Sequence, residues 1–160
     1  MFIADEIPVP VSAGAAAARL AAMAGAGSLD GISQAAWSDG ITRTAQVPGV
    51  SELVHVRHRE PVRRGAVTVL TLRWEAAGPD GAVFPVLDAD ITLAPHGDQA
   101  TLIGLDGVYR PPAGTPGTAP GEAFLHRIAA ATIRALLTQI ADVITGSNLS
   151  HPPPASAPRQ

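Results

Sequence analysis

The feature that most constrains this fold is a long amphipathic helical pattern near the carboxyl end, from Pro120 to about Thr145. At about 100° per residue, one side of this helix is polar, with Arg127, Arg134 and Thr138. The opposite side is apolar and consists of Leu125, Ala129, Ile133, Leu136, Ile140, Val143 and Ile144. The helix is roughly seven turns long, nearly as long as a small domain is wide. Its apolar side must therefore lie across a broad surface.

Length and composition favour one domain. The chain has 160 residues, 46% of them apolar, which is enough for a substantial core. We expect a single domain over residues 1–146 and a disordered proline-rich tail over residues 147–160. The absence of cysteine excludes disulfides, thiolate nucleophiles and zinc-thiolate sites. A net charge of −3 argues against nucleic acid as a partner.

The amino-terminal segment MFIADEIPVP does not have the pattern of a secretory signal. It carries acids where a signal carries bases, and prolines interrupt its apolar run. The alanine-rich segment Ala13 to Ala26 is too short and too weakly hydrophobic to span a bilayer. We therefore expect a soluble, cytoplasmic protein with no membrane span.

The first part of the chain predicts one strand and two short helices. The strand runs from Phe2 to Val9 and is closed by prolines. A helix follows from an N-cap at Ser12 to Gly25, and a second helical pattern covers Leu29 to Trp37.

From Ile41 onward the apolar period changes to two, which is typical of strands. Proline- and glycine-rich turns separate the segments, and connections this short join antiparallel neighbours. The predicted strands are Ile41–Val47, Glu52–Glu60, Ala66–Ala77, Val83–Leu93 and Gln99–Arg110, with turns at Pro48-Gly49, Pro61 to Gly65, Gly78 to Gly81 and Pro95 to Asp98.

The turn at Gly78 to Gly81 permits an assignment of faces if Ala77 opposes Ala82. One face is then polar or mixed, with Thr71, Arg73, Glu75, Phe84, Val86, Asp88 and Asp90. The other face is apolar and should contact the long helix, with Leu70, Leu72, Trp74, Leu87, Ala89, Ile91 and Leu93.

This order of elements, with LRWEAAGPDGAVFPVLDADITL (Leu72 to Leu93) and GVYRPP (Gly107 to Pro112), resembles the SRPBCC or START-like superfamily. The resemblance implies an α+β helix-grip fold, in which a curved antiparallel sheet of about six strands surrounds a long carboxy-terminal helix. It also implies an apolar cavity between helix and sheet. Members of that superfamily bind lipids, polyketides or other hydrophobic molecules, and some catalyse cyclisation or dehydration.

A small hydrophobic ligand, lipid-like or polyketide-like, is therefore our first hypothesis. The residues expected to wall its cavity are Leu70, Leu72, Trp74, Leu87, Ile133, Leu136 and Ile140. Trp74 has a simpler interpretation as plain core packing.

The second hypothesis is an enzyme of the polyketide cyclase or dehydratase type. His126 lies on the inward side of the helix near its start, where its ring could act as acid or base. The simpler interpretation is a half-buried histidine satisfied by Glu122 or by backbone.

Asp106, Tyr109 and Arg110 close the last strand, and the sequence leaves their faces open. If Asp106 and Arg110 point inward, they form a charged pair that could orient a carbonyl, with Arg110 stabilising an enolate. If the register slips by one, Tyr109 supplies a pocket hydroxyl instead. A surface salt bridge at the strand end is the simpler alternative.

Other polar groups give weaker indications. Asp88 and Asp90 could be mistaken for an acid pair or a metal site, but they share a face with Arg73 and Glu75, which favours a solvated face with cross-strand ion pairs. The sequence predicts no metal and no cofactor. His55 and His58 face opposite ways on a strand, and the glycines after the first helix lack the pattern of a nucleotide-binding loop.

The third hypothesis is a protein-docking module that uses the basic run from Arg57 to Arg64. This run could contact an acidic surface such as an acyl carrier protein, or an anionic lipid head group. Charges that protect a sheet edge are the simpler interpretation. A continuous cavity of at least about 300 Å³ would favour the first two hypotheses, and a close-packed interior would favour docking.

Overall fold

The structure is a computed structural model that describes residues 1–44, 53–77, 86–110 and 119–147. Three helices and six strands lie within these residues. In chain order they are β1 (Phe2–Val9), α1 (Ala13–Gly25), α2 (Ser28–Thr44), β2 (Leu53–His58), β3 (Val62–Arg64), β4 (Val67–Ala77), β5 (Val86–Pro95), β6 (Thr101–Arg110) and α3 (Ala119–Thr145).

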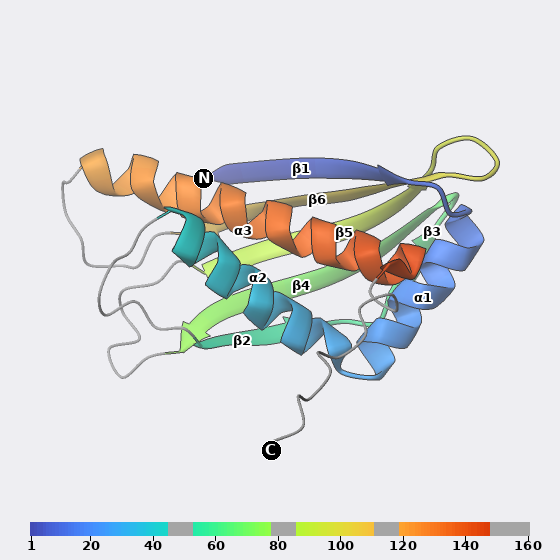
Figure 1. Cartoon of the computed structure of the whole chain (residues 1–160), viewed down its shortest axis with the longest axis horizontal. Coiled ribbons are helices and arrows are strands. Elements are labelled where there is room, and N and C mark those ends of the chain that lie inside the picture. The colour runs from blue at the N-terminus through green and yellow to red at the C-terminus, as the bar shows by residue number, and fades with distance from the viewer. Residues whose placement is uncertain (45–52, 78–85, 111–118, 148–160) are drawn as a thin grey trace, which may run out of the picture.

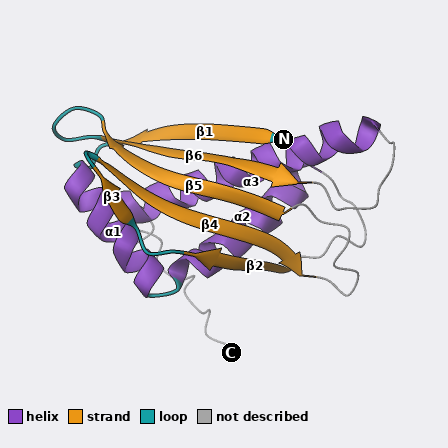
Figure 2. Ribbon diagram, turned by 180° about the vertical axis from the view of Figure 1, so that it is seen from behind, coloured by secondary structure: helices purple, strands orange, loops and turns teal. Residues whose placement is uncertain are grey.

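The strands form one antiparallel sheet in the order β1-β6-β5-β4-β2, and β3 pairs with β4 on the same side as β2. All three helices cover one face of this curved sheet, and α3 crosses it from end to end (Figure 1). Seen from behind, the opposite face carries none of the described helices (Figure 2). This arrangement confirms the predicted α+β helix-grip fold.

The inward side of α3 is the side predicted from its periodicity. Ile133, Leu136 and Ile140 are almost fully buried, whereas Arg127 and Arg134 are exposed. The buried side is wider than predicted because α2 packs against a second flank of α3, where Thr132 and Leu137 are also buried.

By length and composition, His126–Thr145 could cross a membrane. Half of this stretch is buried inside the fold. That burial is what the core helix of a soluble protein shows.

Two predicted elements are wrong. Residues Ile41 to Thr44 continue helix α2 instead of starting a strand, and Pro61 to Gly65 contains the short strand β3 instead of only a turn. The alternation in Ile-Thr-Arg-Thr favours a strand locally, but packing of α2 along α3 overrides that preference. The sixth strand of the sheet is therefore β3, which follows β2 in the chain, and not a strand that starts at Ile41.

The register of the β4–β5 hairpin differs from the prediction by two residues. Trp74 lies opposite Leu87, whereas pairing of Ala77 with Ala82 would place it opposite Pro85. A shift of two keeps every side chain on its face, so the predicted inner and outer faces are confirmed.

The remaining predicted features lie outside the described residues. They are the turns at Pro48-Gly49 and Gly78 to Gly81, the chain from Pro111 to Thr118, and the tail beyond Ser147.

Candidate functional site

A small cavity lies between the sheet and the helices at the end of the sheet where β4 and β6 end and β5 begins. Its volume is about 20 Å³. Every strand from β2 to β6 except β3 contributes one side chain, and α2 and α3 close the other side. The lining residues are Trp37, Val54, Trp74, Leu87, Tyr109, Ala129 and Thr132.

Local periodicity places these side chains together. Trp74, Leu87 and Tyr109 occupy inward positions of three neighbouring strands, paired as Trp74 with Leu87 and Leu87 with Tyr109. Ala129 and Thr132 are three residues apart on α3 and therefore share a face. Their small side chains leave the space that a larger residue would fill.

A close contact between α2 and α3 closes the cavity beside Thr132. A Cβ atom added at Gly40 would lie 2.0 Å from Thr132 Oγ1 and 3.0 Å from Thr132 Cα. Only glycine permits this approach of the two helices, and the approach brings Trp37 of α2 over the void.

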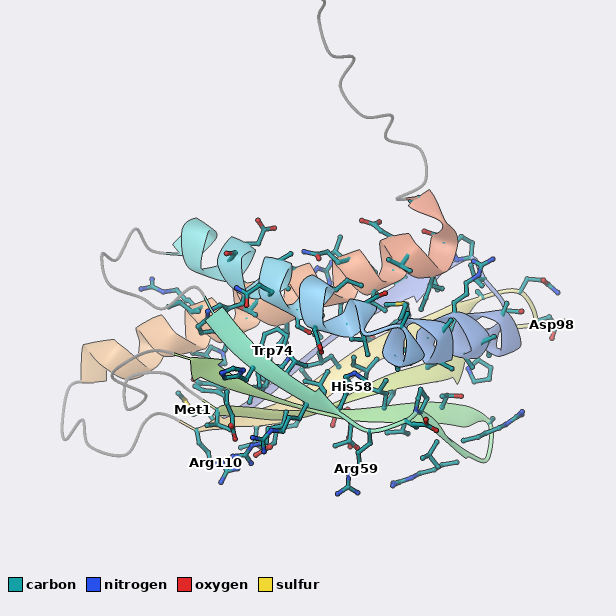
Figure 3. The ribbon with its side chains drawn as sticks, turned by 90° about the horizontal axis from the view of Figure 1, so that it is seen from below. Met1, His58, Arg59, Trp74, Asp98 and Arg110 are labelled. Atoms are coloured by element: carbon teal, nitrogen blue, oxygen red, sulfur yellow. The ribbon has the colours of Figure 1, made fainter. Side chains whose placement is uncertain are left out.

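Two polar atoms of the lining have no hydrogen-bond partner in the described part of the chain. They are Trp74 Nε1 and Thr132 Oγ1, on side chains that are 3% and 1% exposed. A buried polar atom left without a partner costs about 1–3 kcal/mol. Figure 3 shows Trp74 on the helix side of the sheet. These two side chains therefore contribute an N–H donor and a hydroxyl to a largely apolar lining.

Tyr109 is the third polar group of the lining. Its side chain is 1% exposed, which confirms the register in which Tyr109 points inward. Its hydroxyl lies 3.1 Å from Met1 Sδ and 3.4 Å from His126 Nδ1. The predicted inward position of His126 is wrong, because its side chain is exposed and does not line the cavity; its ring centroid lies 6.0 Å from that of Tyr109. The imidazole thus borders the outer end of Tyr109; the side chain of Glu122 is outside the described residues.

The alternative in which Asp106 and Arg110 point inward is wrong. Both side chains are exposed on the outer face, because Ile103, Leu105 and Tyr109 take the inward positions of β6. Arg110 forms an ion pair with Asp88 on that face. It cannot stabilise an enolate inside the cavity.

The charged residues of the outer face form ion pairs, as predicted. Arg73 contacts Glu75 at 2.7 Å and Asp88 at 3.2 Å, and Thr71 donates to Asp90 at 2.6 Å. The hydrogen bond from Arg73 lowers the pKa of Glu75 below its ordinary value. Among the described residues there is no group of three or more His, Cys, Asp or Glu side chains placed to hold a metal ion.

The cavity of about 20 Å³ is far below the size of at least about 300 Å³ expected for the binding and enzyme hypotheses, and it includes fewer of the predicted residues. Trp74 and Leu87 line it, but Leu70, Leu72, Ile133, Leu136 and Ile140 lie in the close-packed core. The sequence analysis missed Trp37, Val54, Ala129 and Thr132. Thr132 could have been found as a polar residue beside the apolar side of α3. Trp37 could not, because its place in the lining depends on the packing of α2 against α3.

Several solved structures are similar to this chain over most of its length. A conserved protein from Geobacillus kaustophilus matches with a TM-score of 0.55 and 15% identity, over 92% of this chain and 97% of that one. Truncated norcoclaurine synthase from Thalictrum flavum matches with a TM-score of 0.48 and 14% identity, over 95% of each chain. An aromatase/cyclase from a Streptomyces species gives a TM-score of 0.31 and 15% identity, over 92% of this chain and 97% of that one.

No protein-family model matches the chain, and no curated protein sequence matches it. The chain has the helix-grip fold that its resemblance to the SRPBCC or START-like superfamily predicts.

Proposed function

We propose that this protein binds a small, largely apolar molecule that carries one oxygen atom, in the cavity beside Trp74 and Thr132. The observation that carries the proposal is a pair of buried polar atoms, Trp74 Nε1 and Thr132 Oγ1, that have no partner among the described residues and belong to a largely apolar lining. An indole N–H can only donate, whereas a hydroxyl can donate and accept. Together they suit a carbonyl or hydroxyl oxygen of a ligand.

The ligand requires a wider cavity than the one present. A volume of about 20 Å³ holds roughly one water molecule, whereas sites for drug-sized ligands measure about 300 Å³ or more. Helix α2 contributes Trp37 to the lining, so a wider cavity requires α2 to separate from α3 at the Gly40–Thr132 contact and from the sheet. Its contact with the sheet includes one hydrogen bond from Val54 N–H to Gln34 Oε1. We propose that α2 shifts outward when the ligand enters.

Native mass spectrometry of the freshly purified protein is the first test. A co-purified apolar molecule would support the proposal and give the identity of the ligand directly. A second test compares two neutral probes of equal shape, acetylnaphthalene and isopropenylnaphthalene, of which the former alone has an oxygen. The hydrogen bond to that oxygen should make acetylnaphthalene bind about tenfold more tightly.

The variants Trp74→Phe and Thr132→Val should reduce this preference, because each removes a polar atom and keeps an apolar side chain of similar size. Thr138→Val is the matched control: Thr138 is exposed on α3, and its hydroxyl donates to the Arg134 carbonyl. The proposal fails if neither probe binds, or if the preference survives both cavity substitutions.

A second candidate function is acid–base catalysis on the bound molecule, as in a polyketide cyclase or dehydratase. The observation that favours it is the distance of 3.4 Å between the Tyr109 hydroxyl and His126 Nδ1 at the edge of the cavity. The buried hydroxyl would face the substrate and the exposed imidazole would exchange its proton with water.

The test uses a short synthetic poly-β-ketone and follows loss of water by mass spectrometry. Catalysis predicts that Tyr109→Phe and His126→Asn abolish turnover and leave binding of acetylnaphthalene unchanged. Wild-type protein that binds the ketone without converting it would leave only the binding function. We further propose that the protein is cytoplasmic.

A further inference from the structure

Eight of the arginines fall into two groups by their contacts, and Arg127 of α3 is a further exposed arginine. Arg73, Arg110 and Arg134 form ion pairs with carboxylates, and Arg19 donates to the carbonyl of Ile144. In contrast, Arg57, Arg59, Arg63 and Arg64 are exposed on β2, on β3 and between them. Within the residues that the structure describes, none of these four forms an ion pair with a carboxylate.

Three of these side chains lie on the same face of the sheet. Arg57 pairs with Arg73 across the strands and Arg64 pairs with Val67, so both share the outer face. The backbone N–H of Arg59 bonds to the Thr71 carbonyl at 3.0 Å, and Figure 3 shows Arg59 pointing away from the helices. We name Arg57, Arg59 and Arg64 the arginine edge.

Arg63 differs from its neighbours. It pairs with Thr68 and lines a hollow of about 330 Å³ beside Ala13 and Ala17 of α1, on the helix side. The basic run from Arg57 to Arg64 therefore does not form one face, and Arg63 is not part of the arginine edge.

Arg57 has a like charge as its cross-strand neighbour. Arg57 lies directly opposite Arg73, and like charges directly opposite each other on neighbouring strands are destabilising. Arg73 is already bound to Glu75 and Asp88. Arg57 attracts Glu75 at longer range only, where it helps to lower the pKa of that carboxyl below its ordinary value. A carboxylate from another molecule would offset this repulsion.

The shape of the charged surface favours a narrow partner. Asp88 and Asp90 of β5 lie on the same outer face as the arginine edge, and Asp106 of β6 follows beyond them. A flat anionic bilayer in contact with this face would also meet these three carboxylates. Single-stranded nucleic acid is bound with aromatic stacking platforms, and the arginine edge contains none.

An acidic helix matches the arginine edge in spacing as well as in charge. Residues two apart on a strand, such as Arg57 and Arg59, are about 7 Å apart. Side chains four apart on a helix are about 6 Å apart, so a row of carboxylates on one helix face can meet successive arginines. The guanidinium fork also suits carboxylates well, because it can donate two parallel hydrogen bonds.

We propose that the arginine edge is a docking surface for an acidic helix of a partner protein. This interaction is independent of the cavity, since Arg57, Arg59 and Arg64 lie on the opposite face of the sheet. It accounts for the exposed arginines that the proposed ligand site does not use.

The test uses a fluorescently labelled, stapled alanine-based helix with glutamate at every fourth position, and a second helix with glutamine at those positions. Fluorescence anisotropy at low salt should show binding of the glutamate helix, with affinity that falls as salt is added. The triple variant Arg57→Gln/Arg59→Gln/Arg64→Gln should bind at least about tenfold more weakly. The single variant Arg59→Gln should lose a smaller part of the affinity.

A control variant with the same change in net charge shows whether the affinity depends on the arginine edge or on the total charge of the protein. It combines Arg127→Gln with Ala18→Glu and Ala35→Glu, three exposed positions on α3, α1 and α2. Its affinity should remain within about threefold of wild type.

The proposal is overturned if the glutamine helix binds equally well, if the triple variant retains full affinity, or if the control loses as much as the triple variant. It is also overturned if phosphatidylserine vesicles or a single-stranded oligonucleotide bind more tightly than the glutamate helix. Circular dichroism of each variant confirms that it remains folded.

Discussion

The two ends of the contact between α3 and the sheet are built differently. At one end, Leu136 and Ile140 are fully buried in the same hydrophobic core as Leu70 and Ile91, and none of these four lines the cavity; we call this the close-packed end. At the other end α3 presents Ala129 and Thr132 to Trp74 and Tyr109, and a void remains between them. Both ends use the same helix and the same strands (Figure 1). The difference therefore lies in side-chain volume and polarity along α3.

This difference separates stability from function within one interface. The close-packed end provides burial of apolar surface, which is the main stabilising contribution to a fold. The open end, which contains the cavity, gives up part of that burial and leaves two polar atoms without partners among the described residues. We interpret the close-packed end as the part that holds the fold together, and the open end as the part that accepts a ligand.

The largest expected effect on stability comes from shortening one leucine at each end of the interface to alanine. Leu136→Ala should reduce the free energy of unfolding by about 3–4 kcal/mol, because it leaves a new cavity in a fully packed region. Leu87→Ala should cost only about 2 kcal/mol, since Leu87 already borders a void and has fewer contacts to lose. Urea unfolding of both variants measures the difference, and equal costs would contradict the comparison.

A second prediction concerns the close contact of α2 with α3 at the open end. Gly40→Ala should destabilise the protein by about 1–2 kcal/mol, because the new Cβ overlaps Thr132, although alanine is the better helix former. Thermal unfolding measures the effect, and adding Thr132→Ala should restore part of the loss. Gly31→Ala on the same helix is the control: a Cβ there meets nothing within 4 Å, so this variant should be stabilised.

A third prediction concerns the unpartnered hydroxyl. Thr132→Val should raise the free energy of unfolding of the ligand-free protein by about 1 kcal/mol, because it removes a buried polar atom without a partner. Thr138→Val, at an exposed position, should change it by less than about half that amount. A loss of stability in Thr132→Val would show that the hydroxyl already has a partner, and the open end would then resemble the packed one.

The smallest effect is expected on the outer face, directly behind the cavity residues. The pKa of Glu75 is lowered by its hydrogen bond with Arg73, so its contribution to stability is present above the unfolded value of 4.5. This contribution is lost as the pH falls through the lower pKa of the folded state. Glu75→Gln should therefore make stability less dependent on pH below 4.5.

Glu60→Gln is the matched control for this last prediction, because Glu60 is exposed and forms no ion pair among the described residues. Urea midpoints measured across acidic pH should be flatter in Glu75→Gln than in Glu60→Gln. Identical curves would show that the ion pair with Arg73 has no effect in solution.

The elements with strong periodicity could be predicted from the sequence. Strand β1 has the predicted bounds, Phe2–Val9, and the inward side of α3 follows from its apolar spacing. The facing of Tyr109 could not be predicted, because apolar residues occur in both alternating sets of β6. Pairing of β6 with β5 and β1 decides it.

The size of the cavity could not be predicted for a different reason. Periodicity predicts the face on which a side chain lies. The size of a void depends instead on the combined volumes of side chains from several helices and strands. Helix α2 supplies Trp37 to the lining, and its last turn was predicted as a strand. The predicted lining therefore included core residues such as Leu136 and omitted Trp37 and Ala129.

The most direct test of ligand binding at the open end uses the intrinsic fluorescence of the protein. The chain has two tryptophans, Trp37 and Trp74, and both line the cavity. Titration with acetylnaphthalene should change their emission and saturate at one molecule per chain. Ala129→Leu, which fills the void, should weaken this binding at least about tenfold, whereas Ala123→Leu at an exposed position of α3 should not. An unchanged emission, or equal binding by wild type and Ala129→Leu, would contradict the assignment of a ligand site to this end of the interface.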